Sequence, residues 1–226
     1  VVLDIVKEAM GSPVEIEYAV DLNKGENGLP SFYLLQIKPL VGNQLSINID
    51  FGKIDRNSML LYTESSLGNG EINHLQDIVF VDIDKFDKLK THEIAGEVEL
   101  INNYMNKHNH EYILIGPGRW GTRDPFLGIP VVWSQISKAR VIVEVSLANF
   151  PLDSSLGSHF FHNVTSMNIG YFSVLDTSMT DFINWELLQE SETMQQTKFL
   201  KHIRFTQPLK VLMNGKQKKS VIIFNH

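Results

Sequence analysis

The 226-residue sequence contains no cysteine. This absence excludes a disulfide framework, a thiolate nucleophile and a zinc site with cysteine ligands. The sequence also has no apolar run long enough to span a membrane, and we expect no secretory signal peptide at its start. Together these absences predict a cytoplasmic protein that does not contact a membrane.

Basic charge is also scarce. Lys and Arg number 20 against 26 Asp and Glu, so the formal net charge is −6 at pH 7. A nucleic-acid-binding surface needs clustered Lys and Arg to contact phosphates. The one basic cluster, Lys216, Lys218 and Lys219, lies in a predicted turn near the C-terminus, where a solvated turn accounts for it. The charge therefore argues against a nucleic acid partner.

The residues that are present indicate a globular chain with both helices and strands. Hydrophobic residues make up 43% of the sequence and charged residues 20%. Hydrophobic periodicity predicts a helix that ends before Gly11, a β-hairpin over 13–40 and a longer helix over 91–107. Further strands are predicted over 59–63, 78–83, 112–115, 141–147, 171–175, 202–206 and 221–224, and a further helix over 158–167. These elements predict an α+β (mixed α/β) fold.

The stretch 41–57 carries mixed signals and separates the hairpin from the remaining elements. We therefore predict two domains, one over 1–45 and a mixed-sheet domain over 46–226. The sequence begins Val1-Val2-Leu3 inside a predicted helix and without Met. We accordingly expect a fragment, with functional residues upstream of it.

The hairpin gathers polar residues on one face. If its turn is symmetric about 26–27, Glu17 lies opposite Gln36 and Glu15 lies opposite Lys38. Mg²⁺ prefers oxygen ligands and often takes one or two carboxylates from the protein, while phosphates and water complete its shell. A nearby cation can offset charge on a transferring phosphoryl group. The alternative is an amphipathic hairpin with a solvated polar face, where Glu15 and Lys38 form a surface ion pair worth at most ~1 kcal/mol.

Two segments of the hairpin resemble a known family. Residues 13–19 read PVEIEYA and residues 32–39 read FYLLQIKP. They resemble the end of the nucleotide-binding domain of phosphoenolpyruvate synthase and pyruvate phosphate dikinase, which has an ATP-grasp fold. The family pattern is an acid-Ile-Glu strand followed by Leu-Gln-x-Arg-Pro. The chain would thus hold the end of an ATP-grasp lobe over 1–45, followed by an accessory domain over 46–226.

The resemblance also implies roles for individual residues. Glu17 would be a metal ligand, and Glu15 and Gln36 would contact the metal or the phosphates of ATP with Mg²⁺. Lys38, to which we assign a catalytic role, stands where the family more often has Arg. Lys keeps the positive charge but loses the bidentate fork of Arg.

The function that follows from the resemblance is phosphoryl transfer from ATP towards pyruvate. The chain would be a fragment of an ATP-dependent phosphotransferase resembling phosphoenolpyruvate synthase, with ATP and pyruvate as its small-molecule ligands. Its partner would be an upstream ATP-grasp lobe of the same protein. The alternative from another class is a non-catalytic module that binds a small anion or serves assembly.

A glycine-rich loop over 116–121 formally spells G-x-G-x-x-G after a predicted strand. A dinucleotide site needs a helix at the third glycine, but Pro125 and Pro130 follow instead. The loop therefore predicts a different anion site, a nest of backbone amides flanked by arginines, for a phosphate or carboxylate. The residues of this predicted site are Gly116, Gly118, Arg119, Gly121 and Arg123.

A tight connection is an equally open interpretation of this loop. In that case Trp120 packs on the body of the domain and Arg123 pairs with Asp124. The stretch 114–145 also resembles the C-terminal region of a bacterial phosphoenolpyruvate-synthase-like subgroup, to which we attach no role.

Two histidines lie in the last predicted helix. His159 could be a phosphocarrier, as in the relay of the wider family, but its surroundings lack the relay motif. His159 and His162 could also face one metal ion, although no third ligand is evident. Structural roles are favoured for both.

Overall fold

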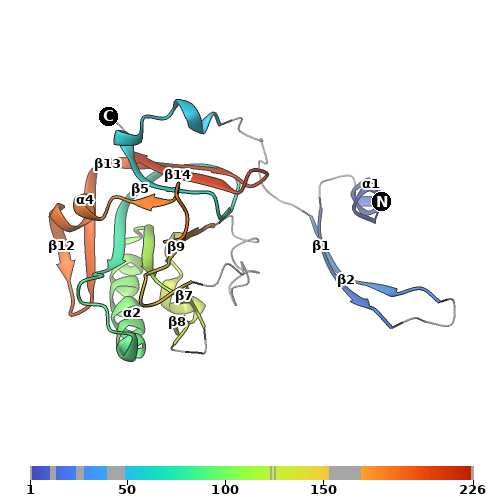
Figure 1. Ribbon diagram of the computed structural model, residues 1–226, viewed down its shortest axis with the longest axis horizontal. Helices are drawn as coiled ribbons and strands as arrows, with labels where there is room; N and C mark the ends of the chain where they lie inside the picture. Colours follow the sequence, from blue (N-terminus) through green and yellow to red (C-terminus); the bar gives the residue numbers. More distant parts are fainter. Residues whose placement is uncertain are drawn as a thin grey trace. The chain divides into compact units, whose positions relative to one another are not determined.

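The computed structural model describes residues 2–10, 14–23, 28–39, 49–122, 124, 126–152 and 169–224 (Figure 1). The chain divides into two compact units, 1–43 and 44–226. This division falls inside the 41–57 stretch, where mixed sequence signals place a boundary. Helices and a large mixed sheet are both present, so the predicted α+β class is confirmed.

The first unit is a helix followed by a hairpin. Helix α1 (Val2–Met10) precedes an antiparallel pair of strands, β1 (Val14–Asp21) and β2 (Ser31–Pro39). The predicted helix and hairpin are therefore confirmed. Val6 and Val14 are buried, and the rings of Tyr18 and Phe32 stack at 5.0 Å between centroids, although both rings are exposed. The buried core of this unit is small.

The second unit is built on a ten-stranded sheet with the order β11-β3-β14-β13-β5-β6-β9-β10-β4, in which β12 also pairs with β13. The strands are β3 (Met59–Thr63), β4 (Ser66–Leu67), β5 (Gly70–Val81), β6 (Tyr112–Pro117), β9 (Ala139–Val145), β10 (Gly170–Val174), β11 (Phe182–Ile183), β12 (Thr193–Gln196), β13 (Leu200–Asn214) and β14 (Lys219–Phe224). A separate parallel pair, β7 (Arg119–Trp120) and β8 (Gly128–Ile129), lies in the glycine-rich region. The helices are α2 (Thr91–His108), α4 (Trp185–Glu190) and the short 3-10 turns Phe51–Lys53, Arg56–Ser58, Lys88–Lys90 and Trp133–Ile136.

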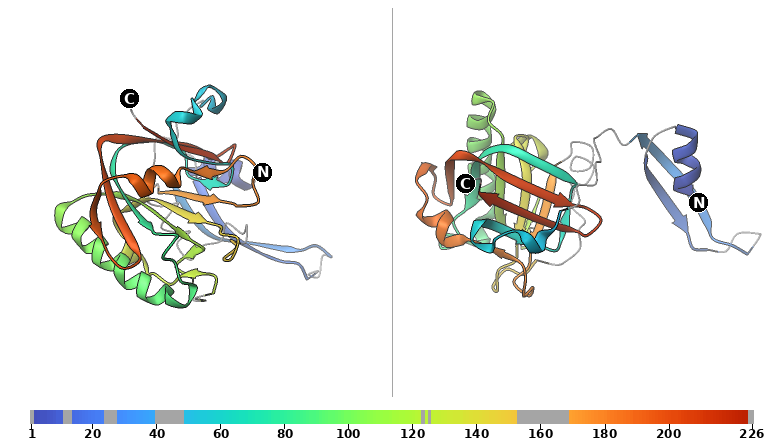
Figure 2. Two further views of the ribbon diagram at one scale, coloured as in Figure 1. Left: turned by 60° about the vertical axis from the view of Figure 1, so that its left-hand side comes forward. Right: turned by 90° about the horizontal axis from the view of Figure 1, so that it is seen from above.

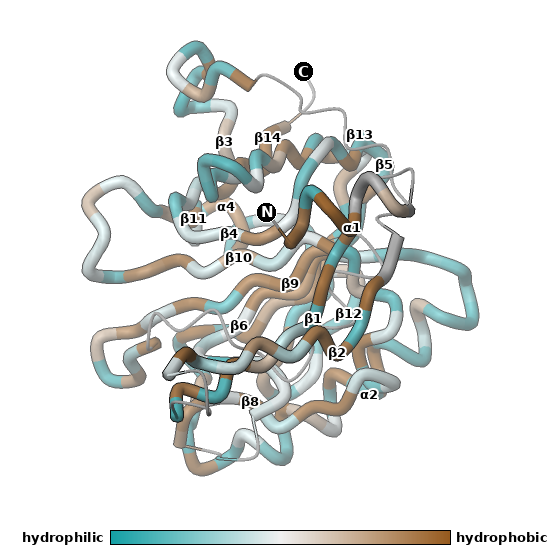
Figure 3. Tube along the Cα trace, turned by 90° about the vertical axis from the view of Figure 1, so that its right-hand side faces the viewer, coloured by the Kyte–Doolittle hydropathy of each residue, from teal (hydrophilic) through white to brown (hydrophobic). Residues whose placement is uncertain are grey.

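Four neighbouring strands of the sheet, β5, β6, β9 and β10, run parallel to one another. Parallel strands are buried on both faces, so they read as continuous apolar runs rather than as alternating ones. The runs YILI in β6 and VIV in β9 have this character, and Figure 3 colours both strands as hydrophobic along most of their length. Their carboxyl ends meet at one edge of the sheet, which we call the carboxyl edge.

The sheet closes on itself through the segment 59–67. Strand β3 pairs with β14, whereas β4, which follows after only two residues, pairs with β10. Ser66 Oγ also lies 2.8 Å from Ser220 Oγ, and the amide of Ser173 donates to Ser65 O at 2.8 Å. The two ends of the strand order are thus joined. The enclosed core is apolar and includes Ile78, Phe80, Ile113, Val143, Phe172 and Ile222.

Helix α2 covers the outer face of the parallel strands (Figures 1 and 2). Its predicted stripe, Ile94, Val98, Ile101 and Met105, is fully buried, and this prediction is confirmed. Asn109 ends the helix in a left-handed conformation with φ of 53°. Helix α4 begins after Asn184, whose side chain accepts from the Leu187 amide, and it buries Leu188 in the enclosed core.

Several sequence expectations need correction. The strand predicted over 78–83 ends two residues early and is the last part of the longer β5. The strand predicted over 202–206 is part of the longer β13. Both strands continue through polar residues. Helix α4 and strands β11 and β12 were not expected. The basic residues Lys216 and Lys218 do lie in the turn between β13 and β14. The helix predicted over 158–167 lies outside the described residues, and none of the described helices is long and apolar enough to cross a membrane.

Candidate functional site

The polar face of the hairpin has the predicted register. Glu15 pairs with Lys38 and Glu17 pairs with Gln36 across β1 and β2. Directly opposed residues of an antiparallel pair project from the same face, and residues two apart on one strand do so too. The four positions therefore share one face of the hairpin, and Glu17 and Gln36 are exposed.

A β-bulge follows this polar group. The register shifts after Glu17, so Tyr18 pairs with Leu34 and Leu35 is left over. The pairing expected from a turn symmetric about 26–27 is therefore right for Glu15 with Lys38 and for Glu17 with Gln36. From Tyr18 towards the turn, each observed partner differs from the expected one by one residue. Bulges increase the local twist and occur often beside functional sites. The bulge separates the polar group from the pairs Tyr18–Leu34, Ala19–Tyr33 and Val20–Phe32.

The second predicted site, the loop after β6, lies at the carboxyl edge of the parallel strands. The loop passes through Gly118 and Gly121, with φ of 69° and 77°, and forms the short strand β7. No helix starts after Gly121 among the described residues up to Val132.

The backbone amides of this loop already have protein acceptors. The amide of Gly118 donates to Val145 O at 2.9 Å, and that of Arg119 donates to Leu127 O at 2.9 Å. The amide of Trp120 donates to Glu144 Oε1 at 2.9 Å. Gly121 donates to Ile129 O at 2.8 Å. The predicted nest of free amides is therefore wrong for these four residues, because each N–H is used inside the fold.

The glycines instead allow close packing. A Cβ atom on Gly118 would lie 2.3 Å from the Phe150 ring and 2.9 Å from Gly128 Cα. A Cβ atom on Gly116 would lie 2.4 Å from the Trp120 ring. Trp120 is 1% exposed, and its ring N–H donates to Val143 O at 3.0 Å. The tight connection with Trp120 packed on the body is thus the observed structure, and Arg123 lies outside the described residues.

Glu144 is the buried acid of the carboxyl edge. It is 3% exposed, and its Oε1 accepts from the Trp120 amide and from the Tyr171 hydroxyl. Burial raises the pKa of Glu144 to about 7, although these two donors and the charge of Arg119 act to lower it. A carboxyl group of this kind can exchange a proton near neutral pH. In the sequence, Glu144 stands out as the single acidic residue inside the apolar run of β9.

Asp82 is a second buried acid at the same edge, directly after β5. Its Oδ1 accepts from Gln189 Nε2 at 3.1 Å, and its Oδ2 lies 3.5 Å from Lys85 Nζ and 3.7 Å from Lys201 Nζ. Burial acts to raise the pKa of Asp82, but the hydrogen bond from Gln189 and the two cations outweigh it and lower the pKa. Asp82 is therefore ionised at neutral pH, whereas Glu144 is protonated in a large share of the molecules.

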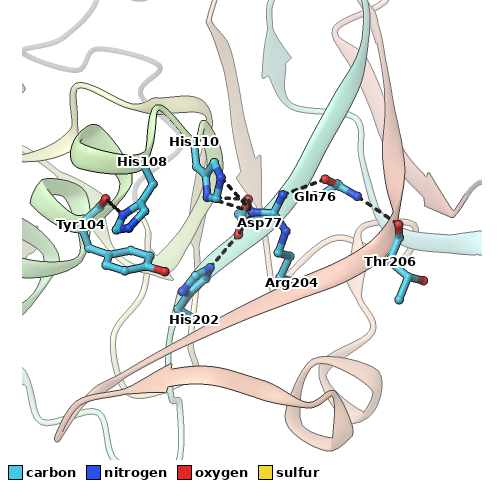
Figure 4. Close-up of polar contacts among 8 residues, drawn as sticks. All are labelled: Gln76, Asp77, Tyr104, His108, His110, His202, Arg204 and Thr206. Atoms are coloured by element: carbon cyan, nitrogen blue, oxygen red, sulfur yellow. Dashed lines mark hydrogen bonds and ion pairs between the residues drawn. The ribbon is translucent and has the colours of Figure 1, made fainter.

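A third polar group, which no sequence motif predicted, lies at the opposite, amino edge of the parallel strands. Asp77 of β5 is buried between His202 and Arg204 of β13, and His110 approaches from the end of α2 (Figure 4). We call Gln76, Asp77, His110, His202 and Arg204 the amino-edge cluster. The only sequence signal was the presence of polar residues inside strands whose neighbours are apolar.

The described residues contain no group of three His, Asp or Glu side chains arranged to hold a metal ion. The hairpin offers two carboxylates and an amide, which is within what Mg²⁺ takes from a protein. His159 and His162 lie outside the described residues, so the structure does not place them.

Comparison with known proteins adds no relative. No protein-family model matches the chain, and neither a curated protein nor a solved structure matches it.

Proposed function

We propose that this chain is part of an ATP-dependent phosphotransferase of the phosphoenolpyruvate synthase type, and that its hairpin helps to bind ATP and Mg²⁺. The observation that supports the proposal is the hairpin register, which opposes Glu17 to Gln36 and Glu15 to Lys38. These are the positions at which the resemblance implies ligands.

Each position has a chemical role in the proposal. Glu15, Glu17 and Gln36 would hold the metal through hard oxygen atoms. The bound metal would neutralise negative charge on the phosphates. Lys38 would add a positive charge beside them, and pyruvate would be the acceptor. The carboxyl edge has no ATP-binding role in the proposal and belongs to the accessory domain. The loop amides from Gly118 to Gly121 donate to protein acceptors and not to a ligand.

The proposal can be tested by metal-dependent nucleotide binding. Mn²⁺ replaces Mg²⁺ at oxygen sites and broadens nuclear magnetic resonance signals near it. With ATP present, substoichiometric Mn²⁺ should broaden the amide signals of 14–18 and 35–38 before those of other residues. Glu17→Ala should abolish this broadening, and in the intact protein it should abolish phosphoryl transfer. The free energy of unfolding should change by no more than about 0.5 kcal/mol because Glu17 is exposed.

Asp21→Asn is the matched control. Asp21 is an exposed carboxylate on the same strand, opposite Ser31, and its carboxylate binds Asn23. This variant should keep the Mn²⁺ effect. Broadening that is absent, or that is equal in the Glu17→Ala and Asp21→Asn proteins, would show that the hairpin holds no metal.

A further inference from the structure

The sequence contains three Asn-Gly steps, at 27–28, 69–70 and 214–215. In such a step the backbone nitrogen of glycine can attack the side-chain carbonyl carbon of the asparagine before it, because glycine has no side chain that hinders the approach. The structure describes both residues of the second and third steps. Their surroundings differ, and the difference singles out Asn214.

The side chain of Asn214 is folded forward over the turn that follows β13. Its Oδ1 accepts hydrogen bonds from the backbone amides of Lys216 and Gln217, each at 3.1 Å. Asn side chains often bond in this way to the backbone two residues ahead. Because both donors follow Gly215 in the chain, the Asn214 side chain is turned towards the Gly215 nitrogen, which is the nitrogen that can attack it.

The two amide donors also suit the chemistry of this attack. When a nitrogen adds to Cγ of Asn214, negative charge develops on Oδ1, the atom that both amides already contact. Preorganised N–H donors aimed at a developing oxyanion lower the barrier to such an addition. The turn thus combines an attacking nitrogen and a stabilised oxyanion in one short segment.

The attacking nitrogen is held loosely and is open to solvent. The Gly215 N–H donates to Asn69 Oδ1 at 3.3 Å, which is longer than the usual range of about 2.7–3.2 Å. Gly215, Lys216 and Gln217 are all exposed, so water reaches the turn.

Asn69 is followed by glycine too, but its surroundings are different. Its Oδ1 accepts from Gly215, which lies in another turn and not in the backbone ahead of Asn69. Gly70 begins β5 and is paired with Met213 in the sheet. Among the described residues, no amide that follows Asn69 in the chain donates to its Oδ1. Asn69 therefore lacks the stabilised oxyanion and serves as an internal comparison.

We propose that Asn214 is a site of spontaneous modification, at which Gly215 closes a succinimide ring that water then opens. In the first step a bond forms between Gly215 N and Asn214 Cγ, and the bond from Cγ to the side-chain nitrogen breaks. The proton of the Gly215 N–H leaves with this nitrogen, which departs as ammonia. In the second step one water molecule adds to a ring carbonyl. Opening on one side gives an aspartyl residue at position 214, and opening on the other gives an isoaspartyl residue, in which the chain continues through the side-chain carbonyl.

The modification would act on the segment that closes the sheet. The Ser66 amide donates to Lys218 O at 3.0 Å, so the turn is bonded to this segment. The contact is close, since a Cβ atom on Gly215 would lie 2.9 Å from Gly68 O. An isoaspartyl residue adds one methylene to the backbone at the end of β13, and so tight a backbone contact cannot absorb it without moving. The bond between Ser66 and Lys218 should therefore open more often in the modified protein.

The test is incubation of the folded protein at neutral pH in buffer made with H₂¹⁸O, followed by digestion in ordinary water and mass spectrometry. Peptides that contain position 214 should gain the mass expected when NH₂ is replaced by ¹⁸OH. Modification during the digestion lacks the label and is thereby separated. Labelling at 214 should be at least about tenfold faster than at 69, because the two donors lower the barrier.

Unfolding provides the control for the turn itself. In urea both Asn-Gly steps lose their surroundings, so labelling at 214 should slow and approach the rate at 69. Asn214→Gln needs a larger ring and should lose the label at 214 while labelling at 69 stays the same. The comparison within the unaltered protein does not depend on this variant.

Three outcomes overturn the proposal. They are no labelling at 214 in the folded protein, labelling there that is no faster than at 69, and labelling there that is equally fast in urea. Amide hydrogen exchange of Ser66 tests the effect on the sheet and should be faster in the modified fraction. Unchanged exchange at Ser66 would contradict that effect.

Discussion

Glu144 and Asp82 are both buried acids at the carboxyl edge, yet their pKa values move in opposite directions. Their exposures are nearly equal, at 3% and 4%. Glu144 is bound by two neutral donors, the Trp120 amide and the Tyr171 hydroxyl, and its pKa rises to about 7. Asp82 has two lysines within 4 Å as well as a neutral donor, and its pKa falls.

The difference shows that burial alone does not set the charge of an acid. Desolvation disfavours the ionised form at both sites. The two donors and the charge of Arg119 reduce this effect at Glu144 without cancelling it. At Asp82 the hydrogen bond from Gln189, together with the charges of Lys201 and Lys85, outweighs it. A proton is therefore available at neutral pH from Glu144 and not from Asp82.

The largest expected effect comes from removing the titration of Glu144. Its folded pKa of about 7 lies above the ordinary 4.5, so the unfolded chain releases the proton first as pH rises. The free energy of unfolding thus declines from pH 4.5 to pH 7, by about 3 kcal/mol in total. Glu144→Gln stays neutral, so it should match the unaltered protein at pH 4.5 and exceed its stability by up to about 3 kcal/mol at pH 8.

Urea unfolding at the two pH values measures this difference. Glu192→Gln, at an exposed position, is the control and should give the same difference from the unaltered protein at both values. A Glu144→Gln effect that does not depend on pH would mean that Glu144 is ionised throughout, as Asp82 is.

A smaller effect of opposite sign is expected at Asp82. Because the pKa of Asp82 is lowered in the folded protein, its ionised form adds to the free energy of unfolding at pH values above the ordinary pKa of 3.8. This contribution is lost as pH falls through the pKa of the folded protein. Asp82→Asn should cost about 2 kcal/mol at pH 7, because the ion pairs with Lys201 and Lys85 are lost and the hydrogen bond from Gln189 loses its charged acceptor. The cost should shrink in acid below pH 3.8. Urea unfolding at pH 7 and pH 3 tests this, and a cost that grows in acid would contradict the pairing.

The smallest effect concerns the neutral donor at Glu144. Tyr171→Phe removes the hydroxyl that favours the ionised carboxyl, so the pKa of Glu144 should rise further. The loss of one hydrogen bond should cost about 1 kcal/mol. The titration of the ¹³C-labelled Glu144 carboxyl reports the pKa directly. A pKa that falls in Tyr171→Phe would show that the hydroxyl binds the protonated acid instead.

Local patterns were sufficient for some elements of this protein. The stripe of α2 repeats at the helical period, and the hairpin strands alternate on either side of a polar turn, so both were predictable. The lengths of β5 and β13 were not, because His74 and Gln76 interrupt the apolar pattern while the backbone continues to pair. The extended pairing depends on strands that lie far away in the sequence.

The candidate sites divide in the same way. The pairing of Glu17 with Gln36 follows from two strands that adjoin in the sequence, with only residues 22–30 between them. The loop at 116–121 has the composition of an anion site. Its amides donate to acceptors in and next to β8 and β9, however, and the sequence does not reveal these acceptors. The amino-edge cluster joins Asp77 to Arg204, 127 positions away, and Arg204 to His110, 94 positions away. Such contacts follow from the topology of the sheet and not from any local pattern.

The closure of the sheet through residues 59–67 has a consequence for folding on the ribosome. Strand β3 needs β14, which ends at Phe224, and β4 needs β10. At about 5–20 residues per second, synthesis leaves β3 without its partner for several seconds or more. Contacts of such long sequence separation also form slowly, on the order of milliseconds to seconds. Met59, Leu60 and Leu61 are exposed to other chains during this time, so the yield of folded protein should depend on chaperones that bind short apolar strands.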